Sequence, residues 1–570
     1  MPAAFTSSRA TGNALLDTID TGFRWTGTIG YNRVDPDNPA EVSAFSAALP
    51  TIYVTQGIGL TNSMWSLVGR SFEILHSFAN ITFELTNAAD ANYFVSDFSR
   101  PDSPNTAGIA ARPGNTPILA FNVGTWETYS DQQQIWIVLH ELGHTLGLRH
   151  PTGTPPELDF SQYTIMASDW FTLGDFDVGG GLPLTPMALD VAVLQANYGA
   201  AANNVSDTRY SLSRFVLDDD GSDGTMQNGG GYICIWDTSG TDTLSYGGTT
   251  AALLNLNAAT LLTTALIGDL ADVIGDVVLN SSIFAGLSAF TRSEIIDPVR
   301  SAGGFFSSLL QGDRREPGGY VIANGARIES ASGGSGGDLM IGNAFANTLR
   351  GNGGADNLFG GSGDDSLEGG AGDDRIFGGL GNDTITDDSG VSNYLRGDEG
   401  DDLLMGGSGF NDINGNMGND TVVAGTGDSW AVGGKDNDSL SGGAGQNLVY
   451  GNLGNDTCDG GAGNDTIRGG QDNDVVSGGD GADFVSGDKG DDTMAGGSGA
   501  DIFHTFGDAG IDRVLDFNLS AGDRVQLGPG TQFTTSQVGE DTVINMTGGG
   551  QMVLVGVSLT TLTGNWIFGA

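Results

Sequence analysis

The feature that most constrains the fold of this chain is a nine-residue repeat that begins near Gly333 and continues to residue 503. Two of its units read GGSGDDSL from Gly360 and GGAGNDTI from Gly460. An apolar or small uncharged residue recurs once per unit, with one extra residue between Ile385 and Leu395. A period this short and this regular predicts a stack of similar supersecondary units in place of a single globular core. The members of this row are Met340, Leu349, Leu358, Leu367, Ile376, Ile385, Leu395, Leu404, Ile413, Val422, Ala431, Leu440, Val449, Cys458, Ile467, Val476, Val485, Met494 and Phe503.

A second row of polar residues stands two positions before the apolar row. Most of its members are aspartates, and carboxylates together with turn carbonyls are hard oxygen ligands that suit calcium. Asparagine replaces aspartate at Asn347, Asn393, Asn411 and Asn447, and serine does so at Ser429. We therefore predict calcium ligands at Asp338, Asp356, Asp365, Asp374, Asp383, Asp402, Asp420, Asp438, Asp456, Asp465, Asp474, Asp483, Asp492 and Asp501.

Each unit of the repeat predicts a short strand followed by a turn. The glycines permit turn conformations that are closed to other residues, and the apolar residue points into a thin core. Two units would make one turn of a parallel β-roll, with about nine turns spaced by ~4.8 Å. Without metal, neighbouring aspartates repel, and we expect the region to be largely unfolded. Low-complexity disorder is the alternative, and the constancy of the period disfavours it.

Composition limits the partners of the chain. Its 570 residues include 70 acidic and 22 basic ones, for a net charge of −48, so nucleic acid and anionic membranes are disfavoured because both require basic patches. Only two cysteines occur, Cys234 and Cys458, so disulfides are not expected to be a major stabiliser. The N-terminus lacks the pattern of a Sec-type signal. Polar residues interrupt the most apolar stretch, residues 251–290, so no transmembrane segment is expected.

Three of the five histidines lie in the segment HELGHTLGLRH, which begins at residue 140. His140 and His144 are four residues apart and share one face of a helix. Gly147 lets the chain leave the helix, so that His150 can return as a third ligand. Three imidazoles with an open fourth position indicate a catalytic zinc ion, and Glu141 would hold a water beside it. Ordinary core or surface histidines are the alternative, which the extended spacing disfavours.

The residues before the motif predict a helix over Gln132–Leu148. Ile135, Val138 and Leu142 recur at three- and four-residue steps, so one side of this helix would be buried and the other would present the histidines. Ser130 or Asp131 is a suitable N-terminal cap.

The extended zinc motif resembles that of the metzincin zinc endopeptidases, and residues 10–200 are similar to the serralysin group of that family. The resemblance implies a turn with a methionine beneath the metal, for which Met166 is the candidate; ordinary core packing is the alternative. It also implies a first helix within Met64–Thr82 and a closing helix near Pro186–Gln195. Serralysins carry a tyrosine ligand two residues after the methionine, where this chain has Ser168, so we expect no tyrosine switch.

The repeats resemble the RTX calcium-binding repeat, which also occurs in serralysins. The expected fold is an α+β metzincin catalytic domain followed by an all-β domain, in which a parallel β-roll is flanked by β-sandwich strands. The expected boundaries are 1–200 for the zinc metalloprotease domain, 201–332 for a linking β segment, 333–503 for the β-roll, and 504–570 for a C-terminal β cap with a type I secretion signal. Within the linking segment, residues 261–316 show helical spacing and look inserted, either as a cover for the sandwich or as a lid or docking element.

The resemblance implies a secreted, calcium-stabilised zinc endopeptidase in which Glu141 is the general base. An edge strand within Thr116–Asn122 would pair with an extended substrate. The expected partners are protein or peptide substrates and the type I secretion apparatus of a Gram-negative cell, and a proteinaceous inhibitor or a cell-surface partner is a further candidate. The alternatives are a surface-layer or adhesive structural protein with a vestigial protease domain, and a different zinc hydrolase on the same fold.

Overall fold

In a computed structural model of the chain, residues 326–569 are described without a gap. Nearer the N-terminus the structure describes 62–85, 131–150, 187–198 and 239–256, together with the shorter strands named below and a few single residues. The chain divides into two units. The first unit comprises residues 1–246 and 255–328, and the second comprises 247–254 and 329–570.

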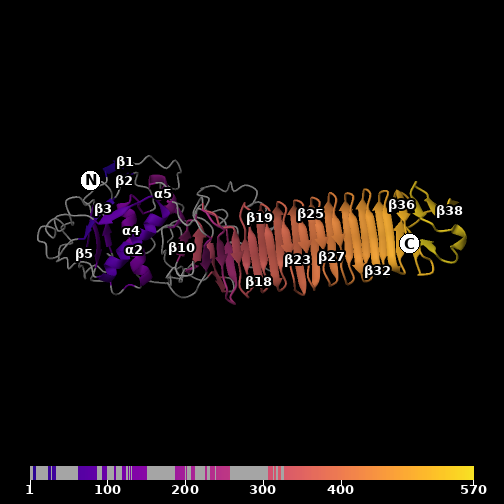
Figure 1. Cartoon of the computed structure of the whole chain (residues 1–570), viewed down its shortest axis with the longest axis horizontal. Helices are drawn as coiled ribbons and strands as arrows, with labels where there is room; N and C mark the ends of the chain where they lie inside the picture. Colours follow the sequence, from indigo (N-terminus) through magenta and orange to yellow (C-terminus); the bar gives the residue numbers. More distant parts are fainter. Residues whose placement is uncertain are drawn as a thin grey trace. The chain divides into compact units, whose positions relative to one another are not determined.

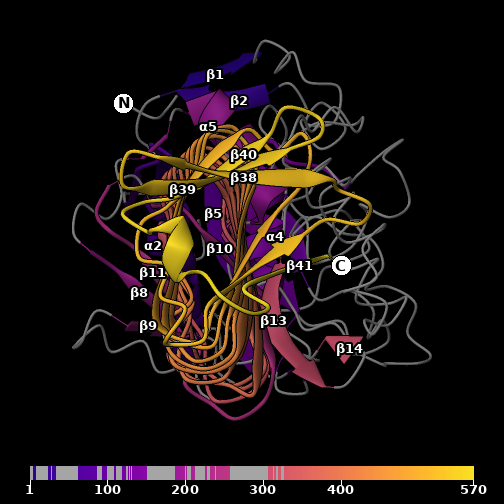
Figure 2. The same ribbon diagram turned by 90° about the vertical axis from the view of Figure 1, so that its right-hand side faces the viewer.

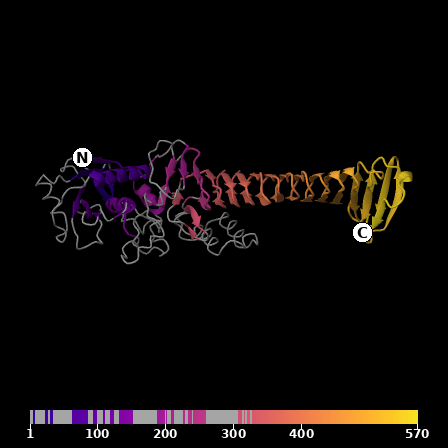
Figure 3. The ribbon, with the colours of Figure 1, turned by 90° about the horizontal axis from the view of Figure 1, so that it is seen from below.

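The second unit contains a parallel β-roll, in which successive strands alternate between two sheets (Figure 1). Seen from below, the stacked strands form a narrow rod that ends in the C-terminal strands (Figure 3). One sheet contains β17 (Leu339–Ile341), β19 (Asn357–Ser362), β21 (Arg375–Leu380), β23 (Ser392–Glu399), β25 (Phe410–Met417), β27 (Ser429–Lys435), β29 (Leu448–Leu453), β31 (Thr466–Gln471), β33 (Phe484–Lys489), β35 (Ile502–Thr505) and β37 (Arg524–Leu527). The other contains β16 (Ser330–Ser332), β18 (Thr348–Gly353), β20 (Ser366–Ala371), β22 (Thr384–Thr386), β24 (Leu403–Met405), β26 (Thr421–Val423), β28 (Ser439–Ser441), β30 (Thr457–Ala462), β32 (Val475–Gly481), β34 (Thr493–Gly499) and β36 (Ile511–Val514).

The apolar row forms the core of the roll. Every member from Met340 to Phe503 is at most 2% exposed, and consecutive turns place equivalent members side by side, as in the pair Leu349 and Leu367. The extra residue after Ile385 is absorbed in the turn before β23, so that Ile376 pairs with Leu395. The predicted β-roll, its core and its shift are therefore confirmed. Cys458 lies in this row as a buried free thiol.

Antiparallel strands follow the last turns of the roll. β38 (Phe533–Val538), β39 (Asp541–Met546) and β40 (Gln551–Leu554) form a meander, and β40 pairs with β36. After the short 3-10 helix η5 (Leu559–Thr561), β41 (Ile567–Gly569) pairs with β37. Viewed along the roll in Figure 2, these strands lie across its end. Covering the end in this way removes an exposed sheet edge that could recruit other chains.

The first unit contains a five-stranded sheet in the order β4 (Phe83–Leu85), β3 (Ile29–Arg33), β5 (Tyr93–Phe98), β7 (Ile118–Asn122) and β6 (Gly108–Ala110). All neighbours are parallel except β6, which runs antiparallel to β7. The prediction of an edge strand within Thr116–Asn122 is therefore wrong: β6 adds to β7 and occupies the edge instead. A separate antiparallel pair is formed by β1 (Ala4–Ser7) and β2 (Phe23–Thr26).

Three helices of the first unit agree with the sequence predictions. They are α2 (Asn62–Phe78), α4 (Asp131–Thr145) and α5 (Ala188–Tyr198). The Gln195 side-chain amide of α5 donates a hydrogen bond to the Phe78 carbonyl at the end of α2, and α2 also packs against α4. No helix among the described residues is long and apolar enough to cross a membrane.

The region between the helices and the roll contains short strands. They are β8 (Arg209–Ser211), β9 (Thr225–Gln227), β10 (Tyr232–Ile235), β11 (Thr243–Ser245), β12 (Ala252–Asn255) and β15 (Gly319–Ile322). The predicted helical insertion, residues 261–316, is wrong at its end, where β13 (Phe306–Gln311) and β14 (Arg314–Arg315) are extended. The reason is strand pairing, since β13 runs antiparallel to β15 and its hydrogen bonds outweigh a helical spacing of side chains. Residues 261–305 lie outside the described residues.

Candidate metal centres

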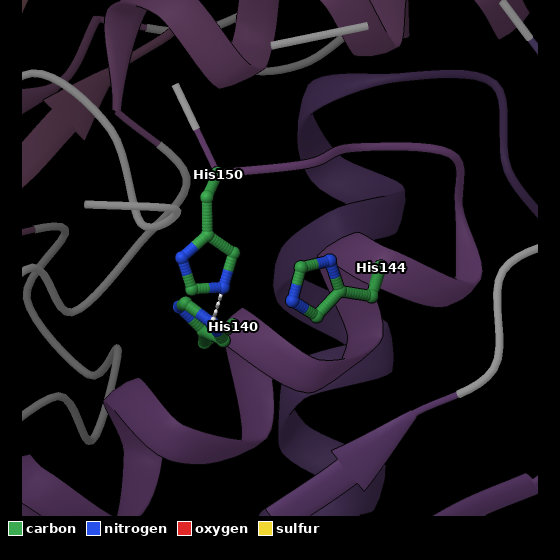
Figure 4. Close-up of side chains that lie close together, drawn as sticks. All are labelled: His140, His144 and His150. Atoms are coloured by element: carbon green, nitrogen blue, oxygen red, sulfur yellow. Dashed lines mark hydrogen bonds between the residues drawn. The ribbon is translucent and has the colours of Figure 1, made fainter. Parts of the chain in front are cut away.

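The three predicted histidines come together at the end of α4 (Figure 4). The Nε2 atoms of His140 and His150 are 3.3 Å apart, and one ring nitrogen from each histidine lies within 4.8 Å of the others. Two nitrogens bound to one tetrahedral zinc at 2.0–2.1 Å would be separated by roughly 3.3 Å. The cluster therefore fits the size of a zinc ion.

The end of α4 explains how His150 reaches the other two histidines. Gly147 adopts a left-handed conformation with φ of 100°, the Gly147 amide donates to the His144 carbonyl, and the Leu148 amide donates to the Gly143 carbonyl. This is a Schellman motif, which ends a helix and reverses the chain. The His144 Nδ1 atom donates to the Leu148 carbonyl at 3.0 Å, which leaves its Nε2 atom free of a proton for a metal.

Two further side chains support this arrangement, and the motif alone did not reveal them. Trp136, one turn before His140, is buried with its ring 4.9 Å from the imidazole. The Tyr198 hydroxyl of α5 donates a hydrogen bond of 2.9 Å to the Leu146 carbonyl. Because the last carbonyls of a helix lack partners within it, this bond fixes the position of the turn that carries His150.

Glu141 lies between the first two histidines on α4. Its side chain is partly exposed, yet enough protein surrounds the carboxyl that burial raises its pKa to about 8. A dication at the histidine cluster would lower that pKa again, because it favours the ionised carboxylate. Met166 and Ser168 lie outside the described residues, so the methionine turn stays a prediction.

The predicted calcium ligands form two ladders inside the turns of the roll. All fourteen predicted ligands, the first of which is Asp338 and the last Asp501, are at most 3% exposed. In each ladder the Oδ1 atom of an aspartate accepts a hydrogen bond from the backbone amide of the equivalent residue one turn earlier, as between Asp356 and the Asp338 amide at 2.6 Å. Along one ladder these bonds run without interruption from Asn347 through Asp365 and onward to the Asp474 amide, which donates to Asp492.

In thirteen of these fourteen carboxylates the second oxygen has no hydrogen-bond partner, whereas Asp338 Oδ2 accepts a hydrogen bond from the Gly334 amide. The oxygens without a partner are the buried Oδ2 atoms of Asp356, Asp365, Asp374, Asp383, Asp402, Asp420, Asp438, Asp456, Asp465, Asp474, Asp483, Asp492 and Asp501. Burial is the largest cause that raises the pKa of these groups, to about 7 for Asp356 and about 8 for Asp402. A buried, unpaired carboxylate is costly unless a cation is bound beside it.

The space beside each free oxygen is kept open by a glycine. A Cβ atom added to Gly360 would collide with Asp365 Oδ2 and would lie 2.6 Å from the carbonyl oxygen of Gly378, the equivalent glycine one turn later. Gly451 has the same relation to Asp456 and Gly469. Carboxylate and carbonyl oxygens thus converge between adjacent turns, and this donor set fits calcium.

The carboxylate oxygens of these aspartates do not form clusters as compact as that of the histidine nitrogens. In the part of the chain that the structure describes, the three histidines form the single group of three or more His, Cys, Asp or Glu ligand atoms that all lie within 4.8 Å. A calcium ion in the roll would therefore need backbone carbonyls as well as carboxylates. The sequence also gave no indication of Asp387, which is buried with a free Oδ2 atom but lies outside the aspartate row.

The repeats match the sequence model of a known family, the RTX calcium-binding nonapeptide repeat. The matched segments are 332–367, 350–385, 396–431, 432–467 and 468–503. Among characterised proteins, the chain is 27% identical to Metalloprotease AprA of Pseudomonas entomophila over 340 residues, which is 54% of this chain and 59% of that protein. It is 31% identical to Serralysin of Photorhabdus luminescens over 307 residues, which is 48% of this chain and 51% of that protein.

The chain is related to the serralysin-type RTX metalloproteases. It spans little more than half the length of these relatives. Its RTX repeats support structural calcium binding in the roll. Among solved structures, the extracellular lipase LipA from Serratia marcescens aligns with 51% of this chain and 47% of that chain, at 16% identity and a TM-score of 0.15, which is too low for the two folds to be compared.

Proposed function

We propose that this chain is a calcium-stabilised zinc endopeptidase. The observation that carries the proposal is the convergence of His140, His144 and His150 within 4.8 Å, with Glu141 beside them on the same helix. Three neutral imidazoles are the donor set of a catalytic zinc that keeps one position open. A purely structural zinc would have four protein ligands and no use for an adjacent carboxylate.

In this proposal, each residue near the cluster has a defined task. A zinc ion held by the three histidines would polarise the substrate carbonyl and lower the pKa of a water. Glu141 accepts the proton of that water and delivers it to the leaving amine. The His144 Nδ1 hydrogen bond to Leu148 holds one imidazole in its binding orientation.

Among the described strands, β4 and β6 form the two edges of the five-stranded sheet. An extended peptide would bind at β6, which runs antiparallel to β7 and lies against α4. The backbone groups on the outer side of β6 can pair with a substrate in the way that sheets add a strand. Substrates are therefore expected to be unfolded or loop segments of proteins.

We further propose that the aspartates of the roll, with the turn carbonyls, hold calcium, and that the protein is exported by a type I secretion system. Unpaired carboxylates would keep the roll unfolded at the low calcium of a cytosol, and external calcium would fold it. A C-terminal secretion signal within residues 504–570 belongs to this proposal.

The decisive experiment compares Glu141→Gln with wild type in a casein digestion assay and in a zinc count. The amide keeps the shape of the side chain but cannot accept a proton, so turnover should fall by on the order of a hundredfold or more. Zinc should remain near one equivalent in both proteins. Glu73→Gln is the matched control, because Glu73 is an exposed carboxylate on α2 of the same unit.

Four results would contradict this proposal. Near-normal turnover of Glu141→Gln would show that this residue is not the base. Less than about a tenth of an equivalent of zinc in wild type would remove the metal site. Activity on esters without activity on peptides would favour a different zinc hydrolase, and an inert protein that still binds calcium would favour the surface-layer or adhesive protein.

A further inference from the structure

The two ladders of the roll differ in their charge. In one, every member from Asp365 to Asp492 is an aspartate. In the other, four consecutive members are neutral, namely Asn393, Asn411, Ser429 and Asn447. The neutral stretch begins at the turn with the extra residue, which also falls between two segments matched by the family model, 350–385 and 396–431.

Asp387 lies at the start of this neutral stretch. It occupies the place that the first glycine of a unit normally takes, two residues after the buried Ile385. Its side chain is 1% exposed. The Oδ1 atom accepts a hydrogen bond from the Ser389 amide at 3.2 Å, while the buried Oδ2 atom has no partner.

The free oxygen of Asp387 lies near that of Asp374, one turn earlier. A Cβ atom built on Gly369 would be 2.6 Å from Asp374 Oδ2 and 3.0 Å from Asp387 Oδ2, so these two oxygens cannot be farther apart than the sum of those distances. Asp374 Oδ1 is already used by the Asp356 amide at 2.8 Å, and its Oδ2 has no partner. Two buried carboxylates thus direct unpaired oxygens to one place.

A comparison with a regular unit shows what has moved. At Gly360, the two oxygens beside a built Cβ belong to Asp365 and to the carbonyl of the glycine one turn later. At Gly369, the second oxygen is the carboxylate of Asp387. The regular position in that turn is Asn393, whose Oδ1 atom still accepts the ladder hydrogen bond from the Asp374 amide at 3.2 Å. In this unit the aspartate of the regular sixth position is replaced by Asn393, and the first position, normally glycine, carries the negative charge of Asp387.

We infer that Asp387 and Asp374 form a divalent-cation site outside the nonapeptide pattern, in which Asp387 substitutes for the carboxylate missing at Asn393. Hard oxygen donors favour calcium, and backbone carbonyls and water would complete its coordination. Burial, and then the charge of Asp374, raise the pKa of Asp387 to about 8, which agrees with two carboxylates that lack a counter-ion. The inference rests on the calcium binding proposed for the roll and is independent of peptidase activity.

The test is to count calcium ions bound to the full chain by native mass spectrometry. Asp387→Asn should bind one calcium fewer than wild type. Asp388→Asn is the matched control, because it removes the same charge from the neighbouring, exposed residue and should leave the count unchanged. The double variant Asp387→Gly with Asn393→Asp restores the glycine and the aspartate of the regular pattern and should bind the wild-type number, whereas Asp387→Gly alone should not.

An unchanged count in Asp387→Asn, or an equal loss in Asp388→Asn, would overturn the site. If Asp387→Asn does not fold, wild-type crystals soaked in Tb³⁺ decide the question: an anomalous peak bound to Asp387 and Asp374 supports the site, and peaks at other turns alone overturn it. A wild-type protein that binds no calcium at all would instead contradict the calcium role proposed for the roll.

Discussion

The two regions for which we propose metal binding are built in opposite ways. The histidine cluster comes from eleven consecutive residues, and one helix end brings its members together. The carboxylates of the roll are joined across turns, through hydrogen bonds between residues that are 18 positions apart in most pairs. A site of the first kind needs only its helix and the packing behind it. Sites of the second kind exist only once the turns have stacked, so cation binding and folding are one process there.

This difference predicts that removal of calcium will have the largest effect and that the effect will be confined to the roll. A core one side chain thick cannot offset the cost of ordering about 170 residues at ~1–2 kcal/mol each. In excess chelator, with zinc restored afterwards, residues 333–503 should unfold while α2, α4 and α5 keep their protection. Hydrogen exchange with circular dichroism would measure this. A roll that stays ordered at micromolar calcium or below would show that its fold does not depend on calcium.

The pH should act on the metal-free roll in the direction opposite to ordinary acid denaturation. Burial raises the pKa of Asp374 to about 6, of Asp356 to about 7 and of Asp402 to about 8, from an ordinary value of 3.8. Protonation therefore stabilises the folded form: the gain is complete below about pH 4 and is lost as the pH rises from 6 to 8.

Circular dichroism in chelator should thus show more strand signal at pH 5 than at pH 8. With calcium present the order should reverse, because protons then compete with the cation for the same oxygens. Equal signals at the two pH values without calcium would mean that the aspartates do not limit the fold.

Tyr198→Phe should affect the histidine region and leave the roll unchanged. The variant loses the hydrogen bond to the Leu146 carbonyl, which would cost about 0.5–1.5 kcal/mol. Hydrogen exchange should rise at residues 143–148 and zinc should dissociate faster, with no change in the roll. Equal protection of this segment in both proteins would show that α5 does not hold the helix end in place.

The smallest effect is expected for Ser168→Ala. Serine is too short to act as the tyrosine ligand of serralysins does, so turnover should stay within about twofold of wild type. A severe loss of turnover, with zinc and fold retained, would assign this residue a task that its chemistry does not suggest.

The sequence predicted the roll well because its rules are local and repeated. Each member of the apolar row has the same surroundings as the next. The assignment of one residue to the row is therefore supported by the members nine residues before and after it. The helix with the histidines was predictable for the same reason, since its apolar stripe lies within one segment. These features depend on residues near one another in the chain.

Features that depend on distant partners were missed. The three residues of β6 have no alternating pattern, and their place at the sheet edge follows only from pairing with β7. Tyr198 reaches a carbonyl 52 residues earlier, which no spacing rule anticipates. Asp387 was hidden because it replaces a glycine, and its importance appears only when the turn that carries Asp374 lies beside it.

The extra residue before β23 also bears on how the roll finds its alignment. A strictly periodic chain could dock each turn on any other at similar cost, and such misaligned stacks would compete with the native one. Ladder hydrogen bonds that cross the irregular turn span 19 residues, as from Asp383 to Asp402, where regular ones span 18. Sliding the stack by one turn would set the longer turn against the wrong neighbour and separate Asp387 from Asp374. The irregular unit therefore distinguishes the native alignment of the turns from alignments that are shifted by one turn.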